Sequence, residues 1–268
     1  MAEPGRRGIR MIVECEHLSK TFSTRNGLIT ALEDISFRTE RREFLCIVGP
    51  SGCGKTTVLK LIAGLIEPDA GRVTFSGLAT DEEPHTPLVF QEHGLFPWKT
   101  VIENVAFGLY RQRRPRAERR TRAHRFLQQV GLGRFANNYP HELSVGMRQR
   151  VNIARAFVSE AQILLMDEPF GSLDAQTKLI LQEELLRIWK DHRKLIIYVT
   201  HDIREAILLG DRVLVMSGHP GRIRNDIPIP IERPRDLSNL DQPEVARIAD
   251  GIWSELKNEV IKSAWEQE

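Results

Sequence analysis

The apolar residues of this chain gather in short runs, each about as long as one buried β-strand. The clearest runs are residues 44–48, 163–166, 195–199 and 212–216. Weaker strand-like segments precede or interrupt them at residues 11–22, 28–37, 73–75 and 88–90, where residues 28–37 could form one strand or two. Helical stretches separate the strand runs, and this alternation indicates an α/β chain.

Helical spacing of apolar residues appears in four places. The first is Val58, Leu59, Ile62 and Leu65, with Gly64 as its one weak point. Further repeats are Val101, Val105 and Leu109, then Leu179, Leu186 and Trp189, then Val245, Ile248, Ile252, Leu256 and Val260. The last repeat predicts an amphipathic helix docked on the parent domain. It follows a proline-stiffened connector at residues 227–236.

A glycine-rich loop stands between the run at 44–48 and the first helical repeat. Its residues are Gly49, Pro50, Ser51, Gly52, Cys53, Gly54, Lys55 and Thr56, which fit G-x-x-x-x-G-K-[ST] without a mismatch. The glycines allow backbone N–H groups to converge on an anion at a helix N-terminus. Lys55 would contact β- and γ-phosphates, and Thr56 would offer a hydroxyl to Mg²⁺. A chance match remains the alternative, but the strand and helix on either side favour a nucleoside triphosphate site.

Two acids end the run at 163–166 and form the second candidate group. Asp167 would hold Mg²⁺, and Glu168 would act as general base toward an attacking water. The alternative is a pair of solvated loop acids. His201 follows the run at 195–199, at the strand end where an α/β sheet binds ligands, so it could reach a γ-phosphate.

Two further residues have both a functional and a structural interpretation. Phe22 lies upstream of the phosphate loop, where an aromatic face could stack on a purine base. A phenylalanine after a strand is also often part of the core. Ser144 is placed as an N-cap before a helix over residues 148–156, and with Gly146 it could form an anion site. Read in isolation, this segment would be an ordinary capped helix.

Composition narrows the class of protein. The chain has 268 residues, with 38 lysines and arginines against 36 acids, which gives no electrostatic case for nucleic-acid binding. No apolar run approaches the roughly 20 residues that span a bilayer, and the start resembles no signal peptide. Three cysteines match no metal site. We therefore expect a soluble, reduced, cytosolic protein. The basic run at 111–120 could bind nucleic acid, but a solvated helix face is the favoured interpretation.

These elements together resemble the ATPase subunit of ATP-binding-cassette (ABC) transporters over about residues 11–216. The resemblance rests on seven motifs in the family's order: Phe22, the loop Gly49–Thr56, Gln91, the signature at 143–147, Asp167 with Glu168, Leu173 with Asp174, and His201. It implies ATP and Mg²⁺ as ligands. It also implies a RecA-like P-loop core with an N-terminal antiparallel β subdomain and a helical insert that bears the signature.

The resemblance implies a domain plan and a set of roles. The core would comprise residues 1–90 and 161–222, the helical subdomain residues 91–160, and the C-terminal connector and helix residues 223–268. Glu168, His201, Gln91 and Lys55 would be catalytic, and Thr56, Gln91 and Asp167 would hold the metal. ATP would contact Phe22, the loop through Thr57, and, across a head-to-tail homodimer, Ser144, Gly146 and Asp174.

Several stretches look like importers of the nitrate, sulfonate, taurine and bicarbonate group. They are residues 94–98, 167–171, 181–189 and 233–236. Partners in such systems are integral-membrane permease subunits and a periplasmic or extracellular solute-binding protein. The resemblance therefore implies a peripheral position on the cytoplasmic face of the membrane, with a permease docked near residues 91–98. The solute itself cannot be read from this subunit.

The signature departs from the family pattern Leu-Ser-Gly-Gly-Gln, because Val145 takes its third position and Met147 its fifth. A β-branched residue accepts positive φ only with strain, so we expect Val145 to weaken the phosphate contact.

Two other functions compete with transport. A soluble ABC ATPase acting on ribosomes or DNA usually carries two cassettes or a long coiled coil, and a P-loop kinase would leave Ser144, Gly146 and His201 without a role.

Overall fold

The computed structural model describes residues 12–25, 27–77, 85–90, 94–112 and 114–265. Its strands form two sheets. A three-stranded antiparallel sheet has the order β2-β1-β4, and a six-stranded sheet has the order β5-β6-β7-β3-β8-β9. The strands of the first are β1 (Ile12–Thr24), β2 (Gly27–Arg38) and β4 (Ala70–Ser76). Residues 28–37 thus lie in a single strand.

The six-stranded sheet is mostly parallel. Strands β5 (Leu88–Val89), β6 (Ile163–Asp167), β7 (Leu195–Thr200), β3 (Phe44–Val48) and β8 (Arg212–Met216) run in one direction, and β9 (Ile223–Pro228) pairs antiparallel to β8. The apolar runs become fully buried strands because both faces of the sheet are covered. This confirms the α/β architecture.

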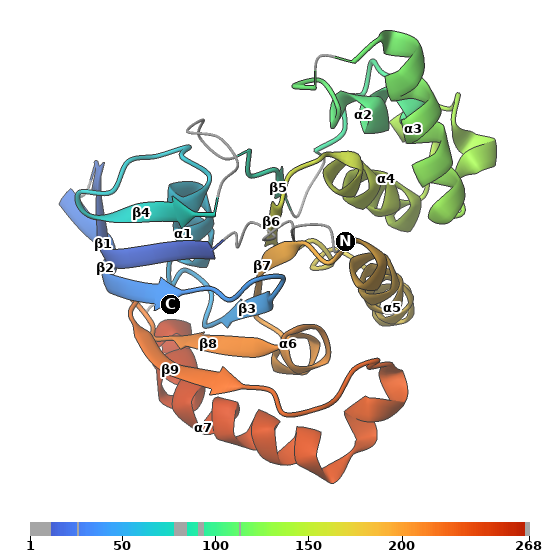
Figure 1. The fold of residues 1–268 in the computed structure, drawn as a ribbon. Coiled ribbons are helices and arrows are strands. Elements are labelled where there is room, and N and C mark those ends of the chain that lie inside the picture. Colours follow the sequence, from blue (N-terminus) through green and yellow to red (C-terminus); the bar gives the residue numbers. More distant parts are fainter. Residues whose placement is uncertain (1–11, 26, 78–84, 91–93, 113, 266–268) are drawn as a thin grey trace, which may run out of the picture.

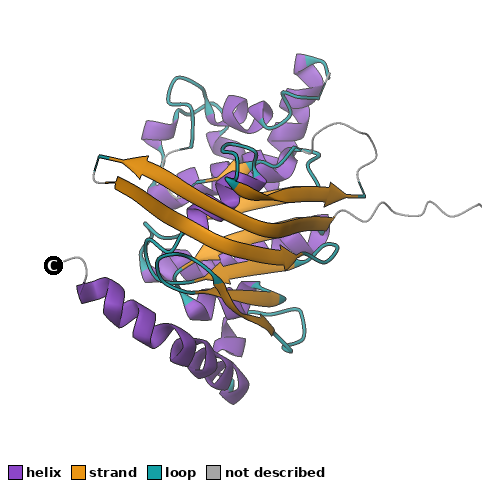
Figure 2. Ribbon diagram, turned by 90° about the vertical axis from the view of Figure 1, so that its left-hand side faces the viewer, coloured by secondary structure: helices purple, strands orange, loops and turns teal. Residues whose placement is uncertain are grey.

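Alternate residues of each central strand enter different parts of the core. Leu45 and Ile47 of β3 pack with residues of β1, β2 and α1 (Lys55–Ile62). Phe44, Cys46 and Val48 face the other side and pack with helices that include α5 (Ala175–His192) and α6 (Ile203–Leu209). Figure 2 shows the antiparallel sheet in front of the rest of the molecule.

The helices α2 (Val101–Phe107), α3 (Arg116–Gln129) and α4 (Val145–Val158) group together at the upper right of Figure 1, beside the end of the large sheet that carries β5. Their apolar residues belong to the same core cluster as one face of that sheet. Short 3₁₀ turns, η1 (Gly133–Phe135) and η2 (Pro140–Glu142), link α3 to α4.

The expected connector begins with regular structure. Residues 223–228 form β9, so the large sheet extends six residues beyond the expected limit of the core at 222. A 3₁₀ turn, η3 (Leu237–Asp241), then leads into α7 (Pro243–Trp265). Val245, Ile252 and Leu256 are buried in the main core cluster, which confirms that the amphipathic helix docks on the parent domain.

The first helix is shorter than its hydrophobic repeat suggests. It ends at Ile62, and Gly64 adopts a φ of 65°, the left-handed conformation that terminates many helices. Leu65 therefore lies beyond the helix and is 59% exposed. Including Leu65 in the helical repeat was wrong, because Gly64 ends the helix instead of merely weakening it.

Candidate active site

The glycine loop joins the carboxyl end of β3 to α1, whose N-cap is Gly54. Gly54 has a φ of 96°, and a Cβ at this position would lie 2.6 Å from Cδ2 of Leu32 and 2.9 Å from the Ala31 carbonyl oxygen. Only glycine fits such a position without strain. The turn is therefore tied sterically to β2 of the antiparallel sheet.

Lys55 is 5% exposed and lies inside this loop. Its Nζ donates hydrogen bonds of 2.9 Å to the carbonyls of Gly49 and Pro50. Burial raises the pKa of the neighbouring Cys53 thiol, so Cys53 acts as a small apolar side chain beneath the loop. The loop therefore presents a cation and backbone N–H groups at one helix N-terminus, a combination suited to phosphate.

A hydroxyl and a carboxylate meet beside the loop. Thr56 Oγ1 donates a 3.0 Å hydrogen bond to Asp167 Oδ1 at the end of β6. Burial raises the pKa of Asp167, and the nearby Glu168 charge acts in the same direction, while the Thr56 hydrogen bond opposes both. Two hard oxygen donors next to a phosphate loop fit Mg²⁺, which binds through one or two protein oxygens together with phosphates.

Glu168 occupies a strained position, with a φ of 42°. Its backbone N–H donates to the Val199 carbonyl at 3.0 Å, which fixes the turn against the end of β7. One carboxylate oxygen lies 2.7 Å from His201 Nδ1, and the other lies 3.8 Å from Lys55 Nζ. The parallel sheet thus brings Lys55, Glu168 and His201 together from three strand ends.

A second group forms where α4 and α5 begin. Ser144 caps α4 and accepts from the Met147 N–H at 3.3 Å, while Asp174 caps α5 and accepts from the Thr177 N–H at 3.0 Å. The N–H of Thr177 lowers the pKa of Asp174. A Cβ on Gly146 would lie 2.9 Å from Thr177 Cγ2, so the two helix starts are in close contact.

Val145 does not adopt the conformation that we expected to cause strain. It is the first residue of α4, with helical backbone, and the described non-glycine residues with positive φ do not include it. Its side chain is 47% exposed. The argument from positive φ was therefore wrong, because a residue that begins a helix needs negative φ and tolerates β-branching.

Two other expected site residues are Phe22 and Gln91. Phe22 lies in β1, 38% exposed, with Lys20 Nζ 5.8 Å from the centre of its ring. Gln91 lies outside the described residues, as do Met11 and residues 92–93 of the expected docking segment.

A polar network behind His201 was not predicted. Glu205 accepts hydrogen bonds from Thr200 Oγ1 and, at 2.8 Å, from Gln182 Nε2. Lys178 Nζ lies 2.8 Å from Asp202, and Asp202 caps α6 by accepting from the Glu205 N–H. This network fixes the turn that carries His201. The pattern Asp-x-x-Glu at 202–205 is a capping signal that could have revealed part of it.

The fold and this site define a P-loop nucleoside triphosphatase. The ABC transporter family matches the chain over residues 32–171. An uncharacterised ABC transporter ATP-binding protein of Methanocaldococcus jannaschii is 44% identical over 95% of both chains. A taurine import ATP-binding protein of Rhizobium johnstonii is 47% identical over 79% of this chain and 82% of its own. The chain belongs to the ABC transporter family and is an ATPase of the ABC type.

A solved dimeric bacterial ABC transporter cassette shares the fold, with a TM-score of 0.71 and 32% identity over 82% of this chain and all of its own. Further relatives, each 41% identical, are named as bicarbonate, aliphatic sulfonate and nitrate import ATP-binding proteins. The predicted family and the RecA-like ABC fold are confirmed.

Proposed function

We propose that this chain hydrolyses ATP to energise a membrane importer of small anions of the nitrate, sulfonate, taurine and bicarbonate type. The observation that carries the proposal is the line of contacts Lys55–Glu168–His201 beside Thr56–Asp167. The names of the relatives support import rather than action on ribosomes or DNA.

The site residues divide the chemistry among them. The loop N–H groups and Lys55 bind the phosphates, and Thr56 and Asp167 hold Mg²⁺. Mg²⁺ held by these residues would supply positive charge beside the phosphates. Glu168 accepts a proton from the attacking water. His201 holds the Glu168 carboxylate in place and lies at the strand end where it can contact the γ-phosphate.

A second copy completes the site in this proposal. Ser144, Gly146 and Asp174 would contact ATP bound to the partner's phosphate loop, and Phe22 would stack on adenine. The contact between Gly146 and Thr177 supports this arrangement because it makes the two capped helix starts one surface. Gln91 would ligate Mg²⁺ and position water.

A permease helix would dock on an aromatic surface formed by Phe96, Trp98, Phe107 and Tyr110. Trp98 is 71% exposed, and the Phe96 ring lies 5.6 Å from Trp98 and 4.7 Å from Phe107. A cavity of about 380 Å³ lies beside three of these rings. Exposed rings gathered next to a cavity are typical of a partner site. The alternative is that Phe96 and Trp98 fill the gap between the core and the helical insert. Phe96 is half-buried, whereas the exposure of Trp98 supports docking.

This surface is held by a buried side chain. Asn104 has no exposed surface, accepts from the Phe96 N–H at 2.8 Å, and donates to the carbonyls of Phe96, Lys99 and Thr100 at 3.0–3.1 Å. The loop therefore presents Trp98 from a fixed backbone. Rigid presentation lowers the entropy lost on binding.

The position of the protein in the cell is also part of the proposal. No helix within the described part of the chain has the length and apolar character needed to span a membrane. We propose a peripheral position on the cytoplasmic face, under a permease that receives its anion from a solute-binding protein.

Nucleic acid is not a proposed partner. Within the basic run, the ion pairs of Arg114 with Glu118 and Glu160 support a structural role for that arginine.

Two measurements test the function. The purified protein should hydrolyse ATP with Mg²⁺ and stop with EDTA, and Lys55→Ala should abolish hydrolysis. A host strain lacking the gene should lose uptake of at least one labelled anion among nitrate, bicarbonate, taurine and an alkanesulfonate. The wild-type gene should restore uptake, and Glu168→Gln should not. Normal uptake of all four anions in the deletion strain would refute the import proposal while leaving the ATPase intact.

A further inference from the structure

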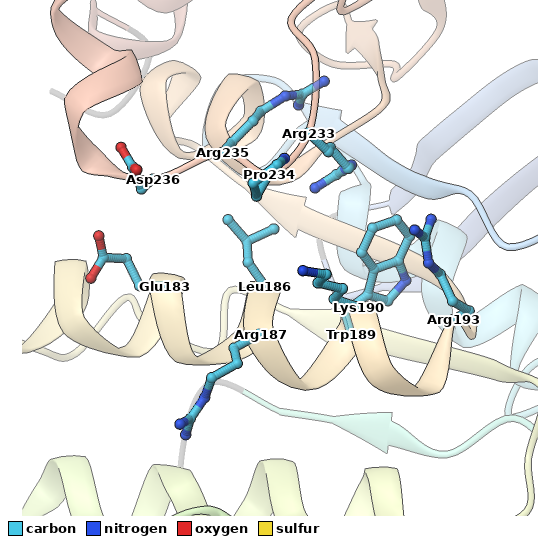
Figure 3. Close-up of a pocket in the computed structure, with 10 residues that line it drawn as sticks. All are labelled: Glu183, Leu186, Arg187, Trp189, Lys190, Arg193, Arg233, Pro234, Arg235 and Asp236. Carbon is cyan, nitrogen blue, oxygen red and sulfur yellow. The ribbon is translucent and has the colours of Figure 1, made fainter.

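Two segments that contribute no residue to the proposed ATPase site line one cavity. These are the second half of α5 and the segment at 233–236, and the cavity between them has a volume of about 320 Å³ (Figure 3). That volume lies at the small end of the range for small-molecule sites. The lining residues are Glu183, Leu186, Arg187, Trp189, Lys190, Arg193, Arg233, Pro234, Arg235 and Asp236.

The middle of the cavity is apolar. Leu186 and Pro234 approach each other across it in Figure 3, with Trp189 next to them. The Trp189 indole N–H already donates to the Lys194 carbonyl at 2.7 Å, so the polar atom of this ring is satisfied. Arg233 lies 4.3 Å and Arg193 5.3 Å from the centre of the Trp189 ring. These contacts fix the ring as a rigid wall.

One end of the cavity carries unneutralised positive charge. Among the described residues, no carboxylate forms an ion pair with Lys190 or Arg193, whereas Arg233 pairs with Asp211 at 2.7 Å. Arg235 lies deeper and donates only to backbone carbonyls. Burial lowers its pKa to about 10, and the charge of Arg233 acts in the same direction. This end is therefore suited to an anion.

The acidic end is already occupied by local hydrogen bonds. Asp236 accepts from the Ser238 N–H at 2.8 Å, where it begins η3, and Glu183 accepts from the Leu237 N–H at 3.3 Å. These two carboxylates stabilise the backbone at the mouth opposite Lys190. They leave the positive charge of Lys190 and Arg193 available to a ligand.

We infer that this cavity binds a small organic anion, with its apolar body against Leu186, Trp189 and Pro234 and its carboxylate or sulfonate group held by Lys190 and Arg193. Charge-assisted hydrogen bonds from these two side chains would supply the specificity. A neutral analogue of the same shape would lose them, and an inorganic anion would lose the apolar contact.

The location gives such a ligand a route to the ATPase site. Helix α5 follows its N-cap Asp174, and Thr177 in its first turn contacts Gly146 at the start of α4. The ligand would contact the other end of α5. Arg193 is followed by Lys194 and then by β7, whose end is followed by His201. A ligand that holds α5 against residues 233–236 should therefore change the rate of ATP hydrolysis. That effect rests on the proposed function, whereas binding itself does not.

Calorimetric titration of the full chain with benzoate and benzenesulfonate tests the inference. We expect one saturable site for each, and binding weaker by about tenfold or more for benzamide and for sulfate, because each lacks one of the two interactions. The double variant Lys190→Gln, Arg193→Gly should lose about tenfold or more in affinity. Glycine suits position 193, whose φ is 47°.

Lys257→Gln is the matched control, because it removes a lysine charge at an exposed position on α7 that does not line the cavity. It should bind benzoate with unchanged affinity. Stabilisation by Mg²⁺-ATP in a thermal melt verifies folding, and Lys190→Gln alone replaces a double variant that fails to fold. No binding of either aromatic anion, equal binding of sulfate, or equal losses in the control and the cavity variants would overturn the inference.

Discussion

An Oε2–Nδ1 distance of 2.7 Å joins Glu168 to His201 across the ends of β6 and β7. The other oxygen of the same carboxylate lies 3.8 Å from Lys55 Nζ. Glu168 is thus held from two sides, and its backbone is fixed by the 3.0 Å bond to the Val199 carbonyl. A carboxylate held in one orientation is suited to act as the general base that takes a proton from the attacking water.

Glu168→Gln should keep ATP binding and lower turnover by about 10²–10⁴-fold, the usual loss when a general base is removed. The amide preserves shape but cannot accept the proton. ATP should accumulate in a dimer, which size-exclusion chromatography with bound-nucleotide analysis will detect. Normal turnover in this variant would remove Glu168 from the catalytic role.

His201→Ala should also slow turnover, but through Glu168. The two residues share one hydrogen bond, so their effects should not add. In the Glu168→Gln background, removal of His201 should cost less than about threefold, compared with about tenfold or more in the wild type. Single-turnover hydrolysis measures all four proteins. Full additivity would show that His201 contributes independently of Glu168.

Val145→Gly should leave ATPase activity within about twofold of wild type and lower stability by at most about 1 kcal/mol, the helix-propensity cost of glycine. Val145 already has helical backbone at the first position of α4, so glycine relieves no strain. Urea unfolding and steady-state ATPase assays test both parts. A large gain in activity would restore the idea that the valine obstructs phosphate.

The sequence could predict the residues at strand ends because their placement depends on local pattern. Fully apolar strands must be buried on both faces, and a parallel sheet then brings their carboxyl ends to one edge. This is how Lys55, Asp167 and His201 come together. The sequence could not predict which side chains bond to one another. The bond between Lys178 and Asp202, for example, depends on how α5 packs beside α6, which no local pattern specifies.

Two misjudged segments have physical explanations. Strand β9 contains Arg224, Asn225 and Asp226, so it lacks the apolar run or alternation that marked the other strands. It forms because an edge strand needs only one partner, here β8, with Asp226 bound to Arg212 at 2.9 Å. The end of α1 was missed because Gly64 can either weaken a helix or end it, and only its φ of 65° decides.

Trp98→Ala should uncouple ATP hydrolysis from transport while leaving basal hydrolysis and stability unchanged. The side chain is 71% exposed, so its loss should change the free energy of unfolding by no more than about 0.5 kcal/mol. Uptake assays with the permease, compared with the ATPase rate of the isolated protein, measure the coupling.

Asn104→Ala provides the contrasting variant. It removes a buried side chain that forms four hydrogen bonds with the loop, so we expect a loss of stability of about 2 kcal/mol or more together with loss of transport. If Trp98→Ala lost basal hydrolysis in step with transport, the aromatic surface would have a packing role rather than a docking role.

The free energy of unfolding should depend on the titration of Lys194 above neutral pH. Lys194 is 7% exposed and donates to the carbonyls of Ser159 and Ala161, both at 2.6 Å. Burial lowers its pKa from 10.5 to about 8, and the charge of Glu160 only partly opposes this. Between these two values the unfolded chain holds a proton that the folded chain has lost, so the contribution of Lys194 to stability rises with pH.

Comparison of the wild type with Lys194→Met isolates this contribution from other groups that titrate in the same range. From pH 7 to pH 9.5 the wild type should gain about 2 kcal/mol relative to the variant, since each unit of pKa difference corresponds to about 1.4 kcal/mol. Urea unfolding at several pH values gives the two curves, and Lys257→Met, at an exposed position on α7, serves as control. Parallel curves for the wild type and Lys194→Met would mean that the two carbonyls keep the ammonium charged, and that burial does not lower this pKa.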